Sequence, residues 1–203
     1  DSAILVKGEA AWSMTVMFLT MWEYVREVKV DYAALRPTGL PPEAALASGY
    51  FVQPYADNPL DNEAVGETVY LNLISKAKRY VYIMTPYLII SDCVNTALCN
   101  AAKSGVDVRI MTPHIPDKPL VFELTRSHYE PLLEAGVRIF EYTPGFVHAK
   151  NLVSDDLYGV VGSINMDYRS MFLHFEDAVW LCHDPTVLDV KQEEQLEDVQ
   201  RLI

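Results

Sequence analysis

Five polar residues stand at fixed spacing in an otherwise apolar, β-prone stretch of the chain. They follow the pattern H-x-K-x4-D-x6-G-S-x-N, with the polar side chains at His148, Lys150, Asp155, Ser163 and Asn165. An imidazole is partly neutral at pH 7 and can therefore act as a nucleophile. An ammonium group offsets the charge of a phosphate, and hydroxyl and amide donors hold its non-bridging oxygens. The pattern therefore predicts a phosphate site with a reactive histidine.

Strand geometry predicts how these side chains meet. In a β-strand, residues two apart point to the same face, about 7 Å apart along the strand. We therefore expect His148 and Lys150 to share one face of a strand. Ser163 and Asn165 share a face of a second strand by the same rule, and Gly162 leaves the backbone beside them unobstructed. If the two segments pair, all four polar groups lie in one patch.

A nucleophilic histidine also needs a partner that orients its second ring nitrogen. Two carboxylates are candidates, Asp155 within the motif and Glu176 in the Leu-His-Phe-Glu stretch that follows it. The residues alone leave both open. A strand pair with scattered polar residues would explain the stretch without any chemistry, but five matched spacings favour the site.

The elements that must position these residues alternate along the chain. Helices are expected over 9–27, over 67–77, from Ser91 or Asp92 to near Gly105, over 119–135 with an interruption at Pro131, and over 186–202. Strands are expected over 50–55, 80–85, 106–112, 137–142, 148–153, 158–162 and 176–182, with no helix between 142 and 186. Alternating helices and strands followed by a strand-rich end predict an α/β/α sandwich with a mixed β-sheet.

Composition narrows the class of protein. Asp plus Glu number 28 against 16 Lys plus Arg, so the net charge is −12. This charge repels nucleic acid at long range and weighs against a nuclease, and any anion site must be a local basic pocket. The three cysteines are expected to be reduced, without a disulfide framework. The apolar stretch over 10–22 is too short to cross a bilayer, so we expect a soluble chain.

The complete motif resembles the HKD signature of the phospholipase D superfamily. In that family an acidic residue about this far beyond the histidine hydrogen-bonds to it, and here this position falls on Glu176. The resemblance thus implies a catalytic set of His148, Lys150, Asp155 and Glu176. Within this set, Asp155 lies beyond the strand end and is expected to fix the turn of the motif or to pair with a basic group.

The resemblance extends over half of the chain. Residues 80–180 are similar to the C-terminal catalytic half of bacterial cardiolipin synthases, with landmarks at 85–87, 104–110, 113–117, 125–129, 134–142, 145–150 and 165–170. Residues 5–22 resemble the close of the first half of that family. We therefore expect residues 1–45 to be the remnant of a preceding domain with its linker, and 46–203 to be the phospholipase D-like domain. The start at Asp1 is interpreted as a cut from a longer protein.

The resemblance implies phosphatidyl transfer between two phosphatidylglycerol molecules, which yields cardiolipin and glycerol through a phosphohistidine. Ser163 and Asn165 would bind substrate, and Arg126 and His128 are expected at the substrate cleft, with a solvated helix face as the alternative. No metal or cofactor is expected. The second histidine must come from an N-terminal HKD half of the same protein, and the parent protein is expected at the cytoplasmic side of the bacterial membrane.

Two other functions remain open. A single-motif phosphodiesterase or nuclease would act as a homodimer that pairs two His148 side chains. A phosphate-binding or phospholipid-binding module would keep the fold without any reaction, although it would have no need of His148 with Glu176 behind it.

Overall fold

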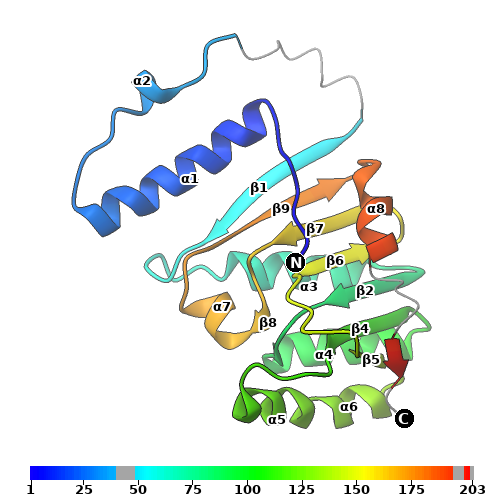
Figure 1. Cartoon of the computed structure of the whole chain (residues 1–203). Helices are drawn as coiled ribbons and strands as arrows, with labels where there is room; N and C mark the ends of the chain where they lie inside the picture. The colour runs from blue at the N-terminus through cyan, green and yellow to red at the C-terminus, as the bar shows by residue number, and fades with distance from the viewer. Residues whose placement is uncertain (40–48, 194–198, 202–203) are drawn as a thin grey trace.

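The structure is a computed structural model that describes residues 1–39, 49–193 and 199–201. It is built on an eight-stranded sheet with the spatial order β1-β9-β7-β6-β2-β4-β5-β10 (Figure 1). The strands are β1 (Phe51–Asp57), β2 (Tyr80–Met84), β4 (Asp107–Pro113), β5 (Arg138–Tyr142), β6 (Asn151–Ser154), β7 (Tyr158–Gly162), β9 (Glu176–Cys182) and β10 (Val199–Arg201). Two short strands, β3 (Leu88–Ile89) and β8 (Met166–Asp167), form a separate parallel pair.

Eight helices are described. They are α1 (Glu9–Arg26), α2 (Tyr32–Leu35), α3 (Val65–Lys76), α4 (Asp92–Lys103), α5 (Pro119–Ser127), α6 (Tyr129–Glu134), α7 (Tyr168–Phe172) and α8 (Thr186–Glu193). Four of them, α3, α4, α6 and α7, contribute to a hydrophobic core against one face of the sheet. The opposite face packs against α8 and the N-terminal segment. This arrangement confirms the predicted α/β/α sandwich with a mixed sheet.

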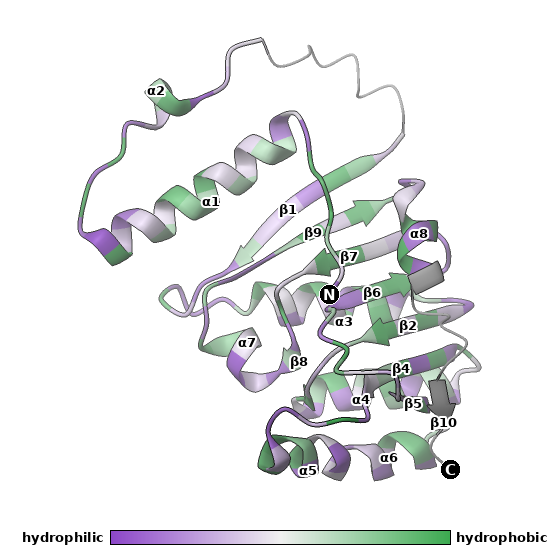
Figure 2. Cartoon of the chain, in the orientation of Figure 1, coloured by the Kyte–Doolittle hydropathy of each residue, from purple (hydrophilic) through white to green (hydrophobic). Residues whose placement is uncertain are grey.

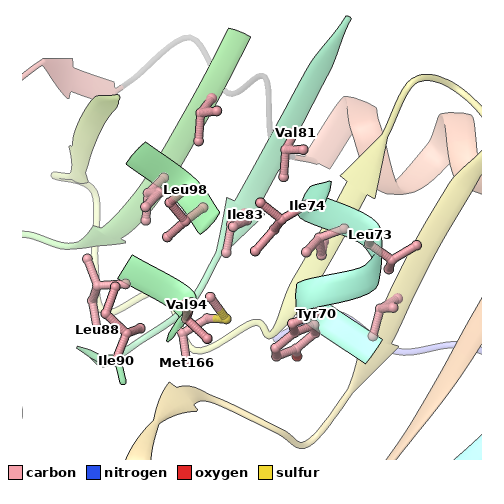
Figure 3. Packing of buried hydrophobic residues seen from close by; sticks show 14 of the residues in the cluster. Tyr70, Leu73, Ile74, Val81, Ile83, Leu88, Ile90, Val94, Leu98 and Met166 are labelled. Carbon is pink, nitrogen blue, oxygen red and sulfur yellow. The ribbon is translucent and has the colours of Figure 1, made fainter. Parts of the chain in front are cut away.

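The side chains of β2 point alternately to the two faces of the sheet, so this strand contributes to both hydrophobic cores. Val81 and Ile83 lie in the core under α3 and α4, where Figure 3 shows them beside Ile74 and Val94. Tyr80, which alternates with them, lies in the smaller core under α8. A strand buried on both faces reads as a continuous apolar run. The apolar run in the sequence therefore predicts this strand correctly, and Figure 2 shows β2 mainly in hydrophobic colours.

Strand direction brings the motif segments to one edge. The strands β2, β4 and β5 are parallel, whereas β6, β7 and β9 each run antiparallel to the strand before them in the sheet. The carboxyl ends of β2, β4, β5 and β7 therefore share an edge with the amino ends of β6 and β9. We call this edge the carboxyl edge. Segments 148–150, 163–165 and 176 all lie along it.

Local capping agrees with the prediction for α4. The Ser91 hydroxyl accepts a hydrogen bond from the Val94 N–H at 3.3 Å, which satisfies one of the free donors of the first turn. The helix gives way at Gly105, whose φ of +92° is a conformation that glycine adopts without strain.

Four predictions of elements were wrong in part. The helix predicted over 119–135 is interrupted at His128 and not at Pro131, which lies in the first turn of α6. The strand expected from His148 begins only at Asn151, so the motif histidine lies in the preceding irregular segment. A short helix, α7, lies where no helix was expected, because the Asp167 side chain accepts from the Ser170 N–H and caps it. The helix predicted over 186–202 ends at Glu193 and is followed by β10, which pairs with β5. Residues 194–198 and 202–203 of this prediction lie outside the described residues.

The N-terminal helix was predicted over 9–27 and spans Glu9–Arg26. It runs beside β1 (Figure 1), but Leu19 is the one helix residue that is buried, and Phe18 and Trp22 stay 52% and 42% exposed. Within the described part of the chain, no helix is both long enough and apolar enough to cross a membrane.

Candidate active site

The histidine and lysine of the motif meet at the amino end of β6. The Lys150 Nζ lies 2.8 Å from the His148 Nδ1 and 3.1 Å from its Nε2, and it also donates to the His148 backbone oxygen. The His148 side chain is 44% exposed, whereas that of Lys150 is 9% exposed. The predicted neighbourhood of these two side chains is thus present, although an irregular segment rather than a strand produces it.

The electrostatics of this pair favour an imidazole without charge. Burial, followed by the nearby Lys150 ammonium, lowers the pKa of His148. Burial also lowers the pKa of Lys150 to about 8, and the carboxylates of Glu176 and Asp167 act in the opposite direction. Near neutral pH the site therefore combines a neutral imidazole with a cation that two acidic groups support.

The first two residues of the chain contact the site at the amino end of β6. The Asp1 Oδ1 lies 3.0 Å from the His148 Nδ1 and 4.0 Å from the Lys150 Nζ. Beside it, the Asn151 amide donates to the Ser2 hydroxyl at 2.8 Å. Sequence reasoning did not identify Asp1, because it lies 147 positions from the motif and belongs to no local pattern.

Glu176 lies at the carboxyl edge but has other hydrogen-bonding partners than His148. The Ser163 hydroxyl donates to its Oε2, and the His174 Nδ1 lies 3.2 Å from its Oε1. Among the described residues, no direct hydrogen bond joins Glu176 to His148. Its effect on the pKa of Lys150 is electrostatic, so Glu176 acts on the motif through the lysine in this structure.

Ser163 and Asn165 follow β7 at the carboxyl edge, and neither has a hydrogen bond to His148 or Lys150 among the described residues. The Ser163 backbone N–H donates to the Asp177 oxygen at 2.8 Å, which ties the segment to β9. The Asn165 amide donates to the Ser170 hydroxyl at 2.9 Å, and its Oδ1 is buried without a hydrogen-bond partner in the described part of the chain. Since the two ends of an amide are interchangeable in assignment, this position can offer a donor or an acceptor to a ligand.

Gly162 allows the close approach of β7 and β9 beside Ser163. A Cβ atom at this position would lie 2.3 Å from the Cβ of Ala178 and 2.5 Å from the Asp177 oxygen. Real Cβ contacts are never this short, so glycine sets the spacing of the two strands that hold Ser163 and Glu176.

Asp155 lies at the other end of β6, away from His148. Its carboxylate accepts backbone N–H groups of three consecutive residues, Lys78, Arg79 and Tyr80, at 2.7 to 3.0 Å. The side chain is 6% exposed and its φ is +58°. The structure therefore places the motif aspartate in the turn between β6 and β7, where it binds the segment that enters β2 and contacts none of the other predicted site residues.

Aromatic side chains form a wall beside the histidine. The Phe146 ring lies 5.7 Å from the His148 ring and 6.4 Å from that of Tyr87. The Tyr87 hydroxyl donates to Asp117 at 2.6 Å, and the Lys118 Nζ lies 5.6 Å from the Tyr87 ring. Sequence reasoning missed Phe146 and Lys118, because no spacing rule links their loops to the motif.

Arg126 and His128 lie on α5 and at its end, and neither contacts His148. The Arg126 Nε lies 3.6 Å from the Glu141 Oε1, and burial lowers the pKa of His128. Their expected place at the substrate cleft therefore stays a prediction. No group of His, Cys, Asp and Glu side chains suited to a metal ion occurs in the described ranges.

Sequence comparison gives a consistent result. Residues 70–196 match the family described as "Cardiolipin synthase, PLD-like domain". The chain is 46% identical over 191 residues to an uncharacterized protein of Streptococcus mutans, covering 94% of the chain and 41% of that protein. It is 37% identical over 188 residues to the cardiolipin synthase of Alkalihalophilus pseudofirmus, covering 92% of the chain and 37% of that protein. The chain thus spans about two fifths of the length of the curated relatives it matches.

Solved structures support the fold. Nuc from Salmonella typhimurium, a phospholipase D family member, aligns with a TM-score of 0.62 at 20% identity, covering 75% of this chain and 98% of that one. Phosphatidylserine synthase of Haemophilus influenzae aligns with a TM-score of 0.60 at 18% identity, covering 75% of this chain and 40% of that one. At these identities the likeness establishes the fold alone.

Proposed function

The chain belongs to the phospholipase D-like domain family of cardiolipin synthases, and from this we propose that it forms one half of an active site for phosphatidyl transfer. The donor and the acceptor are both phosphatidylglycerol, and the products are cardiolipin and glycerol. The observation that supports this proposal is the contact of His148 with the buried Lys150 at the carboxyl edge. Ser163, Asn165 and Glu176 lie along the same edge.

In the first step, a histidine nitrogen attacks the phosphorus of the donor and forms a nitrogen–phosphorus bond. The bond from phosphorus to the glycerol headgroup breaks, and the leaving oxygen takes a proton from a second histidine. In the second step, that histidine accepts the proton of an acceptor hydroxyl, whose oxygen displaces the first histidine from phosphorus. His148 fills one of these two roles, and its lowered pKa suits the nucleophile, which must start without a proton.

The remaining polar groups hold the reacting phosphate. Lys150 offsets the charge of the non-bridging oxygens, and Ser163 and Asn165 provide hydrogen-bonding groups at the opposite segment. Glu176 and Asp167 keep Lys150 protonated. We propose that Glu176 also orients His148 once the substrate has displaced Ser163 from its carboxylate.

The second histidine comes from a further HKD segment, since His148 is the only histidine of this sequence in an H-x-K pattern. We propose an N-terminal half of the same protein as its source. The curated relatives are long enough to hold such a half, because this chain covers 37% of the Alkalihalophilus protein. The substrate is an anionic membrane lipid, so the parent protein would work at the cytoplasmic side of the bacterial membrane.

The test measures phosphatidyl transfer on phosphatidylglycerol vesicles, with cardiolipin and free glycerol as the two readouts. We expect activity only when the chain is joined or mixed with the N-terminal half of its parent protein. The His148→Ala variant of the same preparation should be inactive. Transfer that survives His148→Ala in the reconstituted protein would refute the proposal.

The homodimeric phosphodiesterase remains the second candidate, and one observation favours it. The Salmonella and Helicobacter pylori structures are covered over 98% and 99% of their own length, so a protein of this fold can consist of one such domain. The same assay separates the two. Activity of the isolated chain that rises with the square of its concentration and is lost in His148→Ala would establish the homodimer.

A further inference from the structure

A second cluster of charged and basic side chains lies at the carboxyl edge, around β5, with β2 and β4 between this strand and the motif strand β6. Glu141 in β5 is 3% exposed, and its Oε2 lies 2.8 Å from the His114 Nδ1. Its other oxygen, Oε1, lies 3.6 Å from the Arg126 Nε. Both basic side chains are half exposed, at 49% and 46%. Two cationic or basic groups therefore stand between a buried carboxylate and solvent.

The contact between Arg126 and Glu141 is too loose for a purely structural ion pair. Structural arginine–carboxylate pairs are often bidentate, with two hydrogen bonds of about 2.8 Å. Here the Glu141 Oε1 is buried and has no hydrogen bond in the described part of the chain. Leaving a buried charged oxygen without a donor costs free energy. The geometry instead resembles a carboxylate that orients basic groups for a third partner.

Arg126 keeps donors for such a partner, and His114 adds one when its ring is protonated. Arg126 turns its Nε to Glu141, and its two Nη groups have no hydrogen bond within the described residues. The His114 Nδ1 contacts the Glu141 carboxylate, so its Nε2 donates only from the imidazolium form. A planar guanidinium fork beside an imidazole suits a phosphate group, which accepts several hydrogen bonds at once.

The two clusters are close neighbours along the carboxyl edge. The His114 backbone N–H donates to the Tyr142 oxygen at 3.0 Å, so the segments after β4 and β5 leave the sheet together. One segment continues to Asp117, which accepts from Tyr87, and the other continues through Phe146 to His148. The charges of Asp117 and Lys118 act on the pKa of His148. An aromatic wall thus separates two basic sites on one surface.

We propose that His114 and Arg126, held by Glu141, form a second phosphate subsite that binds the phosphodiester of the acceptor lipid. This inference rests on the proposed function, because the acceptor of that reaction has a phosphate that stays intact. Two like-charged phosphates repel each other when they approach. The Arg126 guanidinium together with a protonated His114 outweighs the single Glu141 charge, offsets this repulsion and positions the acceptor hydroxyl toward the phosphorus bound to histidine.

The first experiment measures binding without any reaction. Soluble dihexanoyl phosphatidylglycerol is titrated into the His148→Ala chain, and the ring signals of His114 are followed by NMR. We expect a saturable shift of the His114 ring and a dissociation constant at least tenfold higher in Arg126→Gln. The matched control is Arg36→Gln, because the Arg36–Glu9 pair joins the same residue types at a surface position. Equal affinities in the two arginine variants overturn the proposal.

Inorganic phosphate serves as a second probe that distinguishes the two sources of this anion. A His114 shift with inorganic phosphate but none with the short-chain lipid overturns the acceptor subsite and leaves a site for free phosphate. His114→Asn gives an independent test at an exposed position in case the loss of charge on Arg126 disturbs folding. The affinity for the lipid, measured by calorimetry because this variant has no His114 ring, should fall as well, and an unchanged affinity counts against the proposal.

The second experiment uses the reconstituted protein and compares transfer with hydrolysis. In Arg126→Gln we expect the KM for the acceptor lipid to rise at least tenfold. The rate of hydrolysis, in which water replaces the acceptor lipid, should be unchanged. Equal losses of transfer and hydrolysis would instead show a structural defect and overturn the subsite. If no reconstituted protein transfers phosphatidyl groups but His114 still binds the lipid, the proposed function fails and the phosphodiester site stands.

Discussion

The motif residues at the two ends of β6 have different roles. At the amino end, Lys150 and His148 meet outside regular structure, and half of the histidine side chain is exposed. At the carboxyl end, Asp155 is buried and accepts three backbone N–H groups from the start of β2. The first end keeps capacity for a ligand, whereas the hydrogen-bonding capacity of the second is used by the protein itself.

Within the eight residues of the H-x-K-x4-D pattern, one end therefore provides reactive groups and the other end stabilises the fold. A group that reacts must keep an open partner position, and its surroundings shift its pKa toward the working range. A group that supports the fold is satisfied in the unliganded protein. Changes at the two ends of β6 should therefore affect different measurements, activity at one end and stability at the other.

The largest effect is expected for His148→Ala. Loss of the nucleophile or of the proton donor should lower the rate of phosphatidyl transfer by at least about 1,000-fold. The free energy of unfolding should change by only about 0.5 kcal/mol, because the side chain is half exposed. Transfer assays and urea denaturation of the same samples check both parts. His183→Asn is the control, since His183 is exposed at a φ of +57° that asparagine tolerates.

Asp155→Ala should show the opposite pattern. Three backbone N–H groups, one buried and two partly buried, lose their acceptor, and we expect the free energy of unfolding to fall by about 3 kcal/mol. Any loss of activity should follow the loss of folded protein, and activity per folded molecule should be retained at low temperature. Asp189→Ala, at an exposed position of α8, should stay within about 0.5 kcal/mol. A stable but inactive Asp155→Ala protein would break the comparison between the two ends.

Much of this division could be predicted from the sequence. The spacing of the motif identified His148 and Lys150 as a pair, and a continuous apolar run located β2, because a strand covered on both faces needs no polar alternation. The position of Asp155 beyond the strand also indicated a place in the turn. These signals are local, since each depends on residues a few positions apart.

The rest depends on contacts between distant segments. The hydrogen bond of Ser163 with Glu176 joins two strands whose spacing depends on Gly162, and no periodicity reveals it. The approach of Asp1 to His148 spans 147 positions. Strand β10 was missed because it is short and adds to the edge of β5, where pairing rather than a hydrophobic pattern defines it.

Gly162→Ala tests whether strand spacing matters to the amino end of β6. The added methyl group would collide with Ala178 and with the Asp177 oxygen, so we expect a destabilisation of about 1 to 3 kcal/mol by overpacking. Activity per folded molecule should also fall, because β7 and β9 hold Ser163 and Glu176. Gly145→Ala is the matched control, since its Cβ would have no atom within 4 Å. Equal stability of the two variants would contradict the tight β7–β9 contact.

The smallest effect is expected in the pH dependence, where Lys150 limits activity on the basic side. Its pKa of about 8 means that the cation at the phosphate site is lost as the pH rises through 8, and transfer should decline there. Glu176 raises this pKa, so Glu176→Gln should move the basic limb to lower pH. Glu134→Gln, at an exposed position before the amino end of β5 and so at the opposite edge of the sheet, should leave the limb unchanged.

Stability should respond to the same group with the opposite sign. The unfolded chain keeps the Lys150 proton up to a pKa of 10.5, whereas the folded chain releases it near 8. Between these values the unfolded state binds more protons, so the free energy of unfolding should rise with pH. Urea denaturation of the wild-type chain and of Lys150→Met from pH 7.5 to 10.5 isolates this contribution. If the basic limb of activity and the rise in stability both disappear in Lys150→Met, the same buried ammonium group causes both. The charge at the amino end of β6 would then favour binding of the phosphate while it lowers the stability of the fold.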